Sequence, residues 1–276
     1  MQILSLELNI GASSPFEIIH MSDTHLTFAD DRNDERKIKL AERRAKVFPE
    51  AEAMLEKASE LSREHNAPVI HTGDIIDFVS ELNLDVAKKF TDENDVFTAA
   101  GNHEFSLYVG EAKEDAAYRE QSLPRVQKAF PNDIRFSSRI INGVNFVAVD
   151  NSYYLFDKWQ LDRLKEEVTK GFPVVLCLHT PLYEEQLYEY LMRNVPENAP
   201  AYLMSVPENK MKKYTPDRYE QQKEDEKTHE AYEYIVNEKN IKVILAGHVH
   251  DNFTFSFGDK VQTGVGCTDL RIIRFS

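Results

Sequence analysis

Five stretches of the sequence place aspartate, asparagine or histidine directly after an apolar run. They are Ser22-Asp23-Thr24-His25, Gly73-Asp74-Ile75-Ile76-Asp77, Gly101-Asn102-His103-Glu104, His179, and Gly247-His248-Val249-His250. Five of the nine histidines of the chain lie in these stretches. Carboxylate, amide and imidazole groups together suit divalent manganese, iron, zinc or cobalt. The residue types therefore predict metal-dependent chemistry if the fold brings the five stretches together.

Each stretch taken alone also has a structural interpretation. Gly73-Asp74 before two isoleucines is typical of a strand-to-helix corner in which Asp74 caps the helix. The complete set favours a metal site, because buried carboxylates and imidazoles need partners that divalent ions supply. The eight candidate groups at these strand ends are more than one ion needs. They suit two ions roughly 3.5–4 Å apart that share one carboxylate.

The apolar runs before these stretches are expected to be strands whose carboxyl ends carry the site. They lie at 16–21, 68–71, 96–100, 173–178 and 241–246. Helices are expected between them, at 34–66 with a kink or restart at Pro49, at 80–90, at 113–130 and at 157–171. This alternation predicts an α/β fold with a largely parallel sheet, in which sites usually form beyond the carboxyl ends of the strands.

Further strands are expected at 2–8 and 144–149, and a strand-rich tail at 253–257, 261–265 and 270–275 is expected to be antiparallel. In the helix that Asp157 caps, Trp159, Leu161, Leu164 and Val168 are expected to face inward. The sequence contains no internal repeat or linker, so 1–276 is expected to be a single domain. An insertion at about 182–230 carries six of the twelve tyrosines.

The composition limits the class of protein. A hydrophobic share of 42% with 29% charged residues is ordinary for a folded protein, and the net charge of −14 argues against a surface for duplex nucleic acid or anionic membrane. Cys177 and Cys267 form no metal or disulfide motif and are expected to be buried thiols. The first residues resemble no signal peptide, which predicts a cytoplasmic enzyme.

The five stretches, taken in order, resemble the five motifs of the calcineurin-like metallophosphoesterases. The match spans 23–250, and the ordered set is far more specific than any single motif. The resemblance implies a four-layered α/β/β/α sandwich with mixed sheets. It also implies a metal-dependent phosphoester hydrolase with two divalent transition-metal ions, manganese, iron or zinc.

Carried over position by position, the resemblance assigns roles to the motif residues. Asp23, His25 and His250 become ligands of the first ion. Asn102, His179 and His248 become ligands of the second, and Asp74 bridges both. The ions would lower the pKa of a shared water, so that a metal-bridging hydroxide attacks phosphorus. His103 would be the catalytic residue that stabilises charge or protonates the leaving oxygen.

Asp77 and Glu104 are expected to support this centre rather than to bind metal. Each could orient a ligating imidazole through its free N–H or cap a local helix. Asp150-Asn151 ends another strand on the same rim, and a supporting pair and a plain turn are both open interpretations. The substrate-binding residues stay unassigned at this point.

The expected substrate is a small or nucleotide-like phosphodiester. Met21-Ser-Asp-Thr-His-Leu26 and the layout from Asp150-Asn-Ser to His179-Thr-Pro181 look most like the bacterial cyclic-nucleotide and glycerophosphodiester phosphodiesterase branch, although Glu104 replaces its usual aspartate. Phe78-Val79 after Asp77 departs from the Asp-Arg-Gly of protein phosphatases, and Asp77 replaces the tyrosine ligand of purple acid phosphatases. A phosphomonoesterase or protein phosphatase with the same centre is the alternative, and a non-catalytic metal-binding scaffold ranks lower.

The insertion follows the strand that ends at His179, so it should begin near the metals and could fold over them as a lid. Its tyrosines could stack on a base or sugar. Its basic residues could steer a phosphate; these are Lys210, Lys212, Lys213 and Arg218. The alternative is a solvated helical insertion with ordinary packing tyrosines.

Overall fold

Two β-sheets form the centre of the molecule in this computed structural model, which describes residues 1–110, 115–194 and 202–276. The first sheet is five-stranded, in the order β1 (Ile3–Leu8), β11 (Leu270–Phe275), β2 (Phe16–Met21), β3 (Val69–His71) and β4 (Val96–Thr98). The second is six-stranded, in the order β5 (Phe136–Ile141), β6 (Val144–Val149), β7 (Val174–Cys177), β8 (Ile241–Ala246), β10 (Lys260–Gly264) and β9 (Phe253–Phe257).

Both sheets are mixed, and their central strands are parallel. Strands β2, β3 and β4 run parallel in the first sheet, as do β6, β7 and β8 in the second. The pairs β2–β11, β5–β6 and β9–β10 are antiparallel. The tail strands are therefore only partly antiparallel, because β10 runs parallel to β8 and β11 parallel to β1.

Alternate residues of each strand face different layers, as the two-residue period of a strand requires. Ile18, Ile70 and Phe97 of the first sheet pack against Phe146 and Val175 of the second. Their neighbours Ile19, Val69 and Val96 face helices instead. Strands buried on both faces have near-continuous apolar sequences, which explains the runs seen here.

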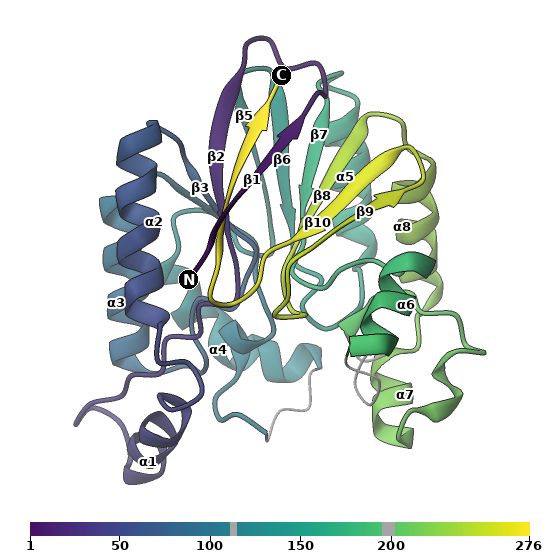
Figure 1. The fold of residues 1–276 in the computed structure, drawn as a ribbon. Coiled ribbons are helices and arrows are strands. Elements are labelled where there is room, and N and C mark those ends of the chain that lie inside the picture. Colours follow the sequence, from purple (N-terminus) through teal and green to yellow (C-terminus); the bar gives the residue numbers. More distant parts are fainter. Residues whose placement is uncertain (111–114, 195–201) are drawn as a thin grey trace.

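Helices cover the outer faces of both sheets, which makes the fold a four-layered α/β/β/α sandwich (Figure 1). Helices α2 (Ala51–His65) and α3 (Glu81–Glu93) lie on the first sheet, and α4 (Ala116–Val126) packs below the strand ends against the short 3-10 helices at His103–Phe105 and Gln127–Ala129. Helices α5 (Lys158–Val168) and α8 (Glu226–Asn237) lie on the second. The predicted helix at 34–66 is interrupted around Pro49 and forms α1 (Glu35–Arg44) and α2.

Three local expectations differ from the structure. Strand β5 was not predicted, since Ser137-Ser138-Arg139 in an edge strand leaves little apolar pattern. Trp159 does not face inward; its side chain is 40% exposed and packs against Phe136. Cys267 lies in a turn and is half-buried, whereas Cys177 is fully buried in β7.

The insertion contains α6 (Glu185–Asn194) and α7 (Pro216–Gln222) and leads into α8. Leu187, Leu191 and Leu203 form a cluster with Val249, and Tyr183, Tyr188, Tyr190, Tyr202, Tyr214 and Tyr219 pack against it. Most of these tyrosines thus serve packing. Lys210 pairs with Glu185, and the side chain of Lys213 lies outside the described residues, as do 195–201. The single domain and the lid stay predictions.

Candidate dinuclear metal centre

The carboxyl ends of five parallel strands bring the motif residues to one place. Asp23 follows β2, Asp74 follows β3 and Asn102 follows β4 in the first sheet, while His179 follows β7 and His248 follows β8 in the second. The sheets lie face to face, so the two groups of strand ends meet across one rim (Figure 1). Every sequence-predicted ligand lies there.

The first group of donors comes from Asp23, His25 and His250, with Asp74 beside them. The Nε2 atoms of His25 and His250 are 3.0 Å apart, and His250 Nε2 lies 3.3 Å from Asp23 Oδ1. Three of these residues are buried, whereas the His250 side chain is 38% exposed. The mixture of imidazole nitrogen and carboxylate oxygen suits a divalent transition metal.

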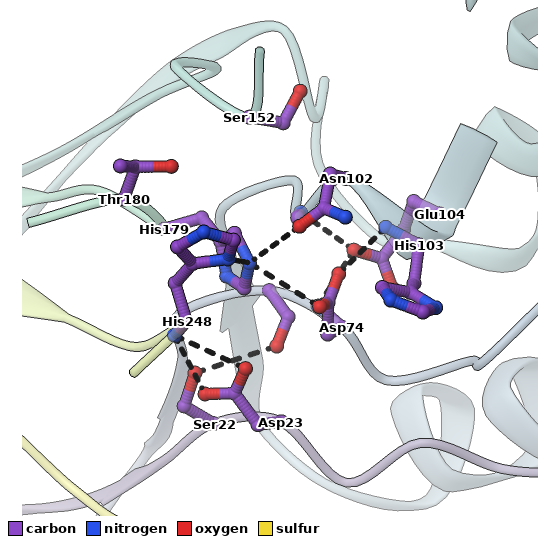
Figure 2. A network of polar contacts seen from close by, with 12 residues as sticks. Ser22, Asp23, Asp74, Asn102, His103, Glu104, Ser152, His179, Thr180 and His248 are labelled. Atoms are coloured by element: carbon purple, nitrogen blue, oxygen red, sulfur yellow. Dashed lines mark hydrogen bonds and ion pairs between the residues drawn. The ribbon is translucent and has the colours of Figure 1, made fainter. Parts of the chain in front are cut away.

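The second group comes from Asp74, His179 and His248, with the amide of Asn102. His179 Nε2 is 3.1 Å from Asn102 Oδ1, 3.1 Å from His248 Nδ1 and 3.3 Å from Asp74 Oδ2. Figure 2 shows Asp74, Asn102 and His179 pointing toward one another. This group is also fit to hold a divalent ion.

One oxygen of Asp74 faces both groups. Its Oδ2 lies 3.7 Å from His25 Nε2 and 3.3 Å from His179 Nε2. Its Oδ1 is held by the backbone N–H of His103 at 2.8 Å. The carboxylate is thereby fixed in the orientation that a bridging ligand needs.

Hydrogen bonds select one ring nitrogen of three histidines for the centre. His25 donates Nδ1–H to Asp77 at 3.0 Å, and His179 donates Nδ1–H to the carbonyl of Thr72 at 2.8 Å. His248 contacts the hydroxyl of Tyr154 through Nε2 at 2.8 Å. The opposite nitrogen of each ring faces the neighbouring donors, which is the arrangement of metal-ligating histidines.

The ionisation states of the buried aspartate and histidine side chains also favour bound cations. Burial opposes ionisation of Asp74, yet His179 and the other nearby imidazoles hold its pKa well below the ordinary range. Burial lowers the pKa of His25 to about 4 and that of His248 to about 3, so both rings are neutral. Burial would also lower the pKa of His179, but Asp74 outweighs it and raises the pKa to about 9. The raised pKa of His179 shows that the buried carboxylates attract positive charge, and a divalent ion in place of the His179 proton fits them beside the neutral rings of His25 and His248.

Left-handed backbone at five of the motif residues turns these side chains inward. The φ angles are 55° at Asp23, 52° at His25, 59° at Asp74, 67° at His248 and 54° at His250. Such conformations cost non-glycine residues about 1–2 kcal/mol each and persist where the surroundings hold them. Here the N–H groups of Asp23 and His25 donate to the carbonyls of Gly73 and Asp74, each at 2.9 Å.

Two acidic residues support the ligands in different ways. Asp77 accepts from His25, is paired with Arg44 at 2.6 Å, and its carbonyl accepts from His103 Nδ1 at 2.7 Å. Among the described residues, the hydrogen bonds of Glu104 are with backbone N–H groups rather than with an imidazole. Its carboxylate accepts the backbone N–H groups of Asp74, Ile75 and Gly101 at 2.6–2.7 Å. Glu104 therefore ties the loop after β3 to the loop after β4.

His103 lies beside the first group of donors. Its ring centroid is 4.6 Å from that of His25, and its Nδ1 is committed to Asp77. The ligand atoms of His25, Asp74 and His103 also lie close enough to one another to hold an ion. Burial opposes protonation of His103, but Asp74 and Asp77 together raise its pKa to about 10. A cationic ring at this position is suited to an anionic substrate.

Sequence reasoning did not find three residues of the site. The Phe48 ring stacks on His25 with centroids 4.1 Å apart and planes 12° apart. Tyr154 contacts His248, and the ring of Tyr202 meets His248 edge to face at 5.5 Å. These contacts join segments far apart in the chain, and nothing in the local sequence pattern marks them.

Gly73 allows a close approach of two loops, and Gly73→Ala is expected to disrupt the centre. A Cβ there would lie 2.5 Å from Gly101 N and 2.6 Å from His179 Nδ1, at a φ of 96°. Gly171 is the matched control, because it has a φ of 80° and open space around its Cβ position. Gly171→Ala should lower the free energy of unfolding by about 1–2 kcal/mol. Gly73→Ala should lower the free energy of unfolding by more than this and should also reduce metal content. Equal losses of unfolding free energy in denaturant titrations of the two variants would contradict the steric account.

Comparisons with known proteins agree with this architecture. The family model of the calcineurin-like phosphoesterases matches residues 16–252. A dimetal phosphatase from Danio rerio superposes with a TM-score of 0.50 and 14% identity over 92% of this chain and 88% of its own. A phosphopantetheinyl hydrolase from Mycobacterium tuberculosis has a TM-score of 0.48 and 12% identity over 91% of this chain and 89% of its own.

A Staphylococcus aureus protein assigned as a 5′-nucleotidase has a TM-score of 0.49 and 13% identity over 95% of this chain. The present chain spans only 51% of that protein. No curated protein matched the sequence. Among the helices of the described residues, none is long and apolar enough to cross a membrane. With a family match over most of its length and the motif donors gathered at one rim, this chain belongs to the calcineurin-like phosphoesterases, as a metal-dependent phosphoester hydrolase.

Proposed function

We propose that the enzyme is a dinuclear phosphodiesterase that acts on a small or nucleotide-like diester. The observation that carries the proposal is the position of Asp74 Oδ2, within 3.7 Å of His25 Nε2 and 3.3 Å of His179 Nε2. One carboxylate oxygen between two sets of donors is what a pair of ions sharing a ligand requires. The alternative is a phosphomonoesterase that uses the same centre.

We assign the first ion to Asp23, His25 and His250, and the second to Asn102, His179 and His248, with Asp74 shared. The donor atoms support this assignment, since each set combines imidazole nitrogen with carboxylate or amide oxygen. When bound, two divalent cations lower the pKa of a water and offset charge on phosphoryl oxygens. The identity of the metal and a cytoplasmic location stay predictions from the sequence.

His103 is proposed to act on the substrate directly. Its Nδ1–H is donated to the carbonyl of Asp77, so Nε2 is the ring atom left for a phosphoryl or leaving-group oxygen. Asp77 and Asp74 favour the protonated ring, which can supply positive charge or a proton as the leaving oxygen departs. Asp77 has a second effect, because it fixes His25 and His103 relative to each other.

The pairing of Arg44 favours a diester over a monoester. A phosphomonoester dianion carries one more charge than a diester, and a further cation at the site, in addition to His103, would favour it. Arg44 reaches the motif residues, but its guanidinium makes two short contacts with the Asp77 carboxylate at 2.6 and 2.7 Å. Phe78 is fully buried beside α1, so the position of the arginine of protein phosphatases is filled by a core residue.

The purified enzyme, reconstituted with Mn²⁺, is expected to contain close to two ions per chain and to hydrolyse an aryl phosphodiester faster than the matching aryl monoester. Elemental analysis gives the first quantity, and release of the aryl alcohol gives kcat/KM for both substrates. A preference for the monoester would establish the alternative. A protein that binds no metal after reconstitution would overturn the proposed centre itself.

A further inference from the structure

The loop between β6 and α5, residues 150–154, contacts both histidines assigned to the second ion. We propose that this loop positions the second metal site, and that Tyr154 selects Nδ1 of His248 as its ligand atom. The inference rests on the proposed dinuclear centre and adds residues with no assigned role. The sequence alone left Asp150-Asn151 open between a supporting pair and a plain turn.

Tyr154 holds His248 by a buried contact. Its hydroxyl lies 2.8 Å from Nε2, and the two rings meet edge to face with centroids 5.5 Å apart. The tyrosine is only 2% exposed, and its backbone adopts a left-handed φ of 65°. A neutral His248 that donates Nε2–H to this hydroxyl keeps an unprotonated Nδ1. That nitrogen is the one that lies 3.1 Å from His179 Nε2.

Asn151 holds the turn that carries His179. Its Oδ1 accepts the backbone N–H groups of His179 at 3.0 Å and Thr180 at 3.1 Å, and its Nδ2 donates to the carbonyl of Thr180 at 2.7 Å. Three hydrogen bonds from one buried side chain fix the end of β7. The N–H of Tyr154 also donates to the carbonyl of Asn151 at 2.9 Å, so the two supports are connected.

The base of the loop is anchored by charge. The carboxylate of Asp150 is 1% exposed and is paired with Arg119 at 3.1 Å and Arg135 at 2.8 Å. It also accepts from the hydroxyl and the backbone N–H of Ser152. A buried carboxylate with four donors is costly to move, which gives Asn151 and Tyr154 a rigid base.

The first site has different supports. His25 is held by Asp77, from the loop after β3, and stacked on Phe48, from the segment between α1 and α2. A substitution in the loop after β6 should therefore lower the affinity for only one of the two ions. A single-site effect separates the proposal from a general loss of stability, which would lower the affinity for both ions.

Tyr154→Phe tests this inference, because it removes the hydroxyl and retains the ring. Loss of such a support should lower the affinity for the second ion about 10–100-fold and leave the affinity for the first ion nearly unchanged. Tyr234→Phe is the matched control, since Tyr234 lies on α8, outside this loop, and its described contacts are with Lys165 and Glu238. The manganese-loaded proteins would be dialysed against increasing chelator, and the ions retained per chain would be counted.

A second readout reports the ring nitrogen directly. In the zinc-loaded protein, the Nε2–H proton of His248 should give a protected imidazole signal by NMR, and this proton should exchange faster in Tyr154→Phe than in Tyr234→Phe. If Tyr154→Phe keeps both ions at wild-type affinity with a protected Nε2–H, the inference is wrong while the proposed function stands. If the wild-type protein binds no metal, that result would instead contradict the proposed function.

Discussion

Asp74→Asn is expected to lose both metal ions and with them the phosphoesterase activity. The substitution keeps the size of the side chain but removes the negative charge and replaces one carboxylate oxygen by an NH₂ group. Oδ2 faces both donor sets, and Oδ1 already accepts the N–H of His103. Because a direct ligand is lost from both sites, affinity for each ion should fall by more than the roughly 10–100-fold typical of a supporting residue.

His250→Gln serves as the single-site control for Asp74→Asn. The described contacts of the His250 imidazole are with Asp23, His25 and Phe48 at the first site. This variant should lose the first ion and retain the second in the same chelator titration. An Asp74→Asn protein that still holds two ions, or that loses only one as His250→Gln does, would show that Asp74 is not shared.

His103→Ala is expected to retain both ions and to lose about 10²–10⁴ in kcat, the usual contribution of general acid–base catalysis. In the proposed role the ring acts on the substrate through Nε2, because Nδ1 is held by the carbonyl of Asp77. Diesters with aryl leaving groups of decreasing pKa distinguish protonation from charge stabilisation. If the ring protonates the leaving oxygen, the loss should shrink as the leaving group becomes a better one.

The metal content of His103→Ala distinguishes two roles for His103, contact with the substrate and binding of an ion. The closeness of His103 to His25 and Asp74 would also allow it to bind an ion. A His103→Ala protein with two ions and low turnover supports the substrate-facing role. Loss of an ion would make His103 a ligand, and unimpaired turnover would remove it from the reaction.

The position of the site could be predicted from the sequence, because the carboxyl ends of parallel strands lie at the same edge of a sheet. The apolar runs before Asp23, Asp74, Asn102, His179 and His248 all became strands of two face-to-face sheets. Local sequence could not show that the strands divide between two sheets. That division came from the family resemblance, and the alternation of Ile18 and Ile19 between two cores is its physical basis.

The features that the sequence failed to predict are those whose local apolar pattern is weak or misleading. Strand β5 has polar residues at its centre and pairs only with β6, so an edge strand here carries little periodic signal. Trp159 was expected in the core from its size and spacing, but Arg135 and Phe136 provide a surface on which a large ring can lie half-exposed. Tertiary contacts of this kind leave no trace in local spacing.

The supports of the ligands were predictable only where motif spacing placed them. Asp77 follows Asp74 by three residues and was expected near the centre, and it contacts His25. Tyr154 and Phe48 reach His248 and His25 from distant segments, and their types are typical of any core. Left-handed φ angles at ligands, such as Asp23 and His248, are equally invisible in a sequence without glycine at those positions.

The most direct test of a shared centre is anomalous diffraction from crystals of the enzyme grown with Mn²⁺. The account predicts two manganese peaks about 3.5–4 Å apart, with Asp74 Oδ2 between them. One peak should lie among Asp23, His25 and His250, and the other among Asn102, His179 and His248. A single peak, or peaks that leave Asp74 outside the coordination of either ion, would contradict the two-metal account.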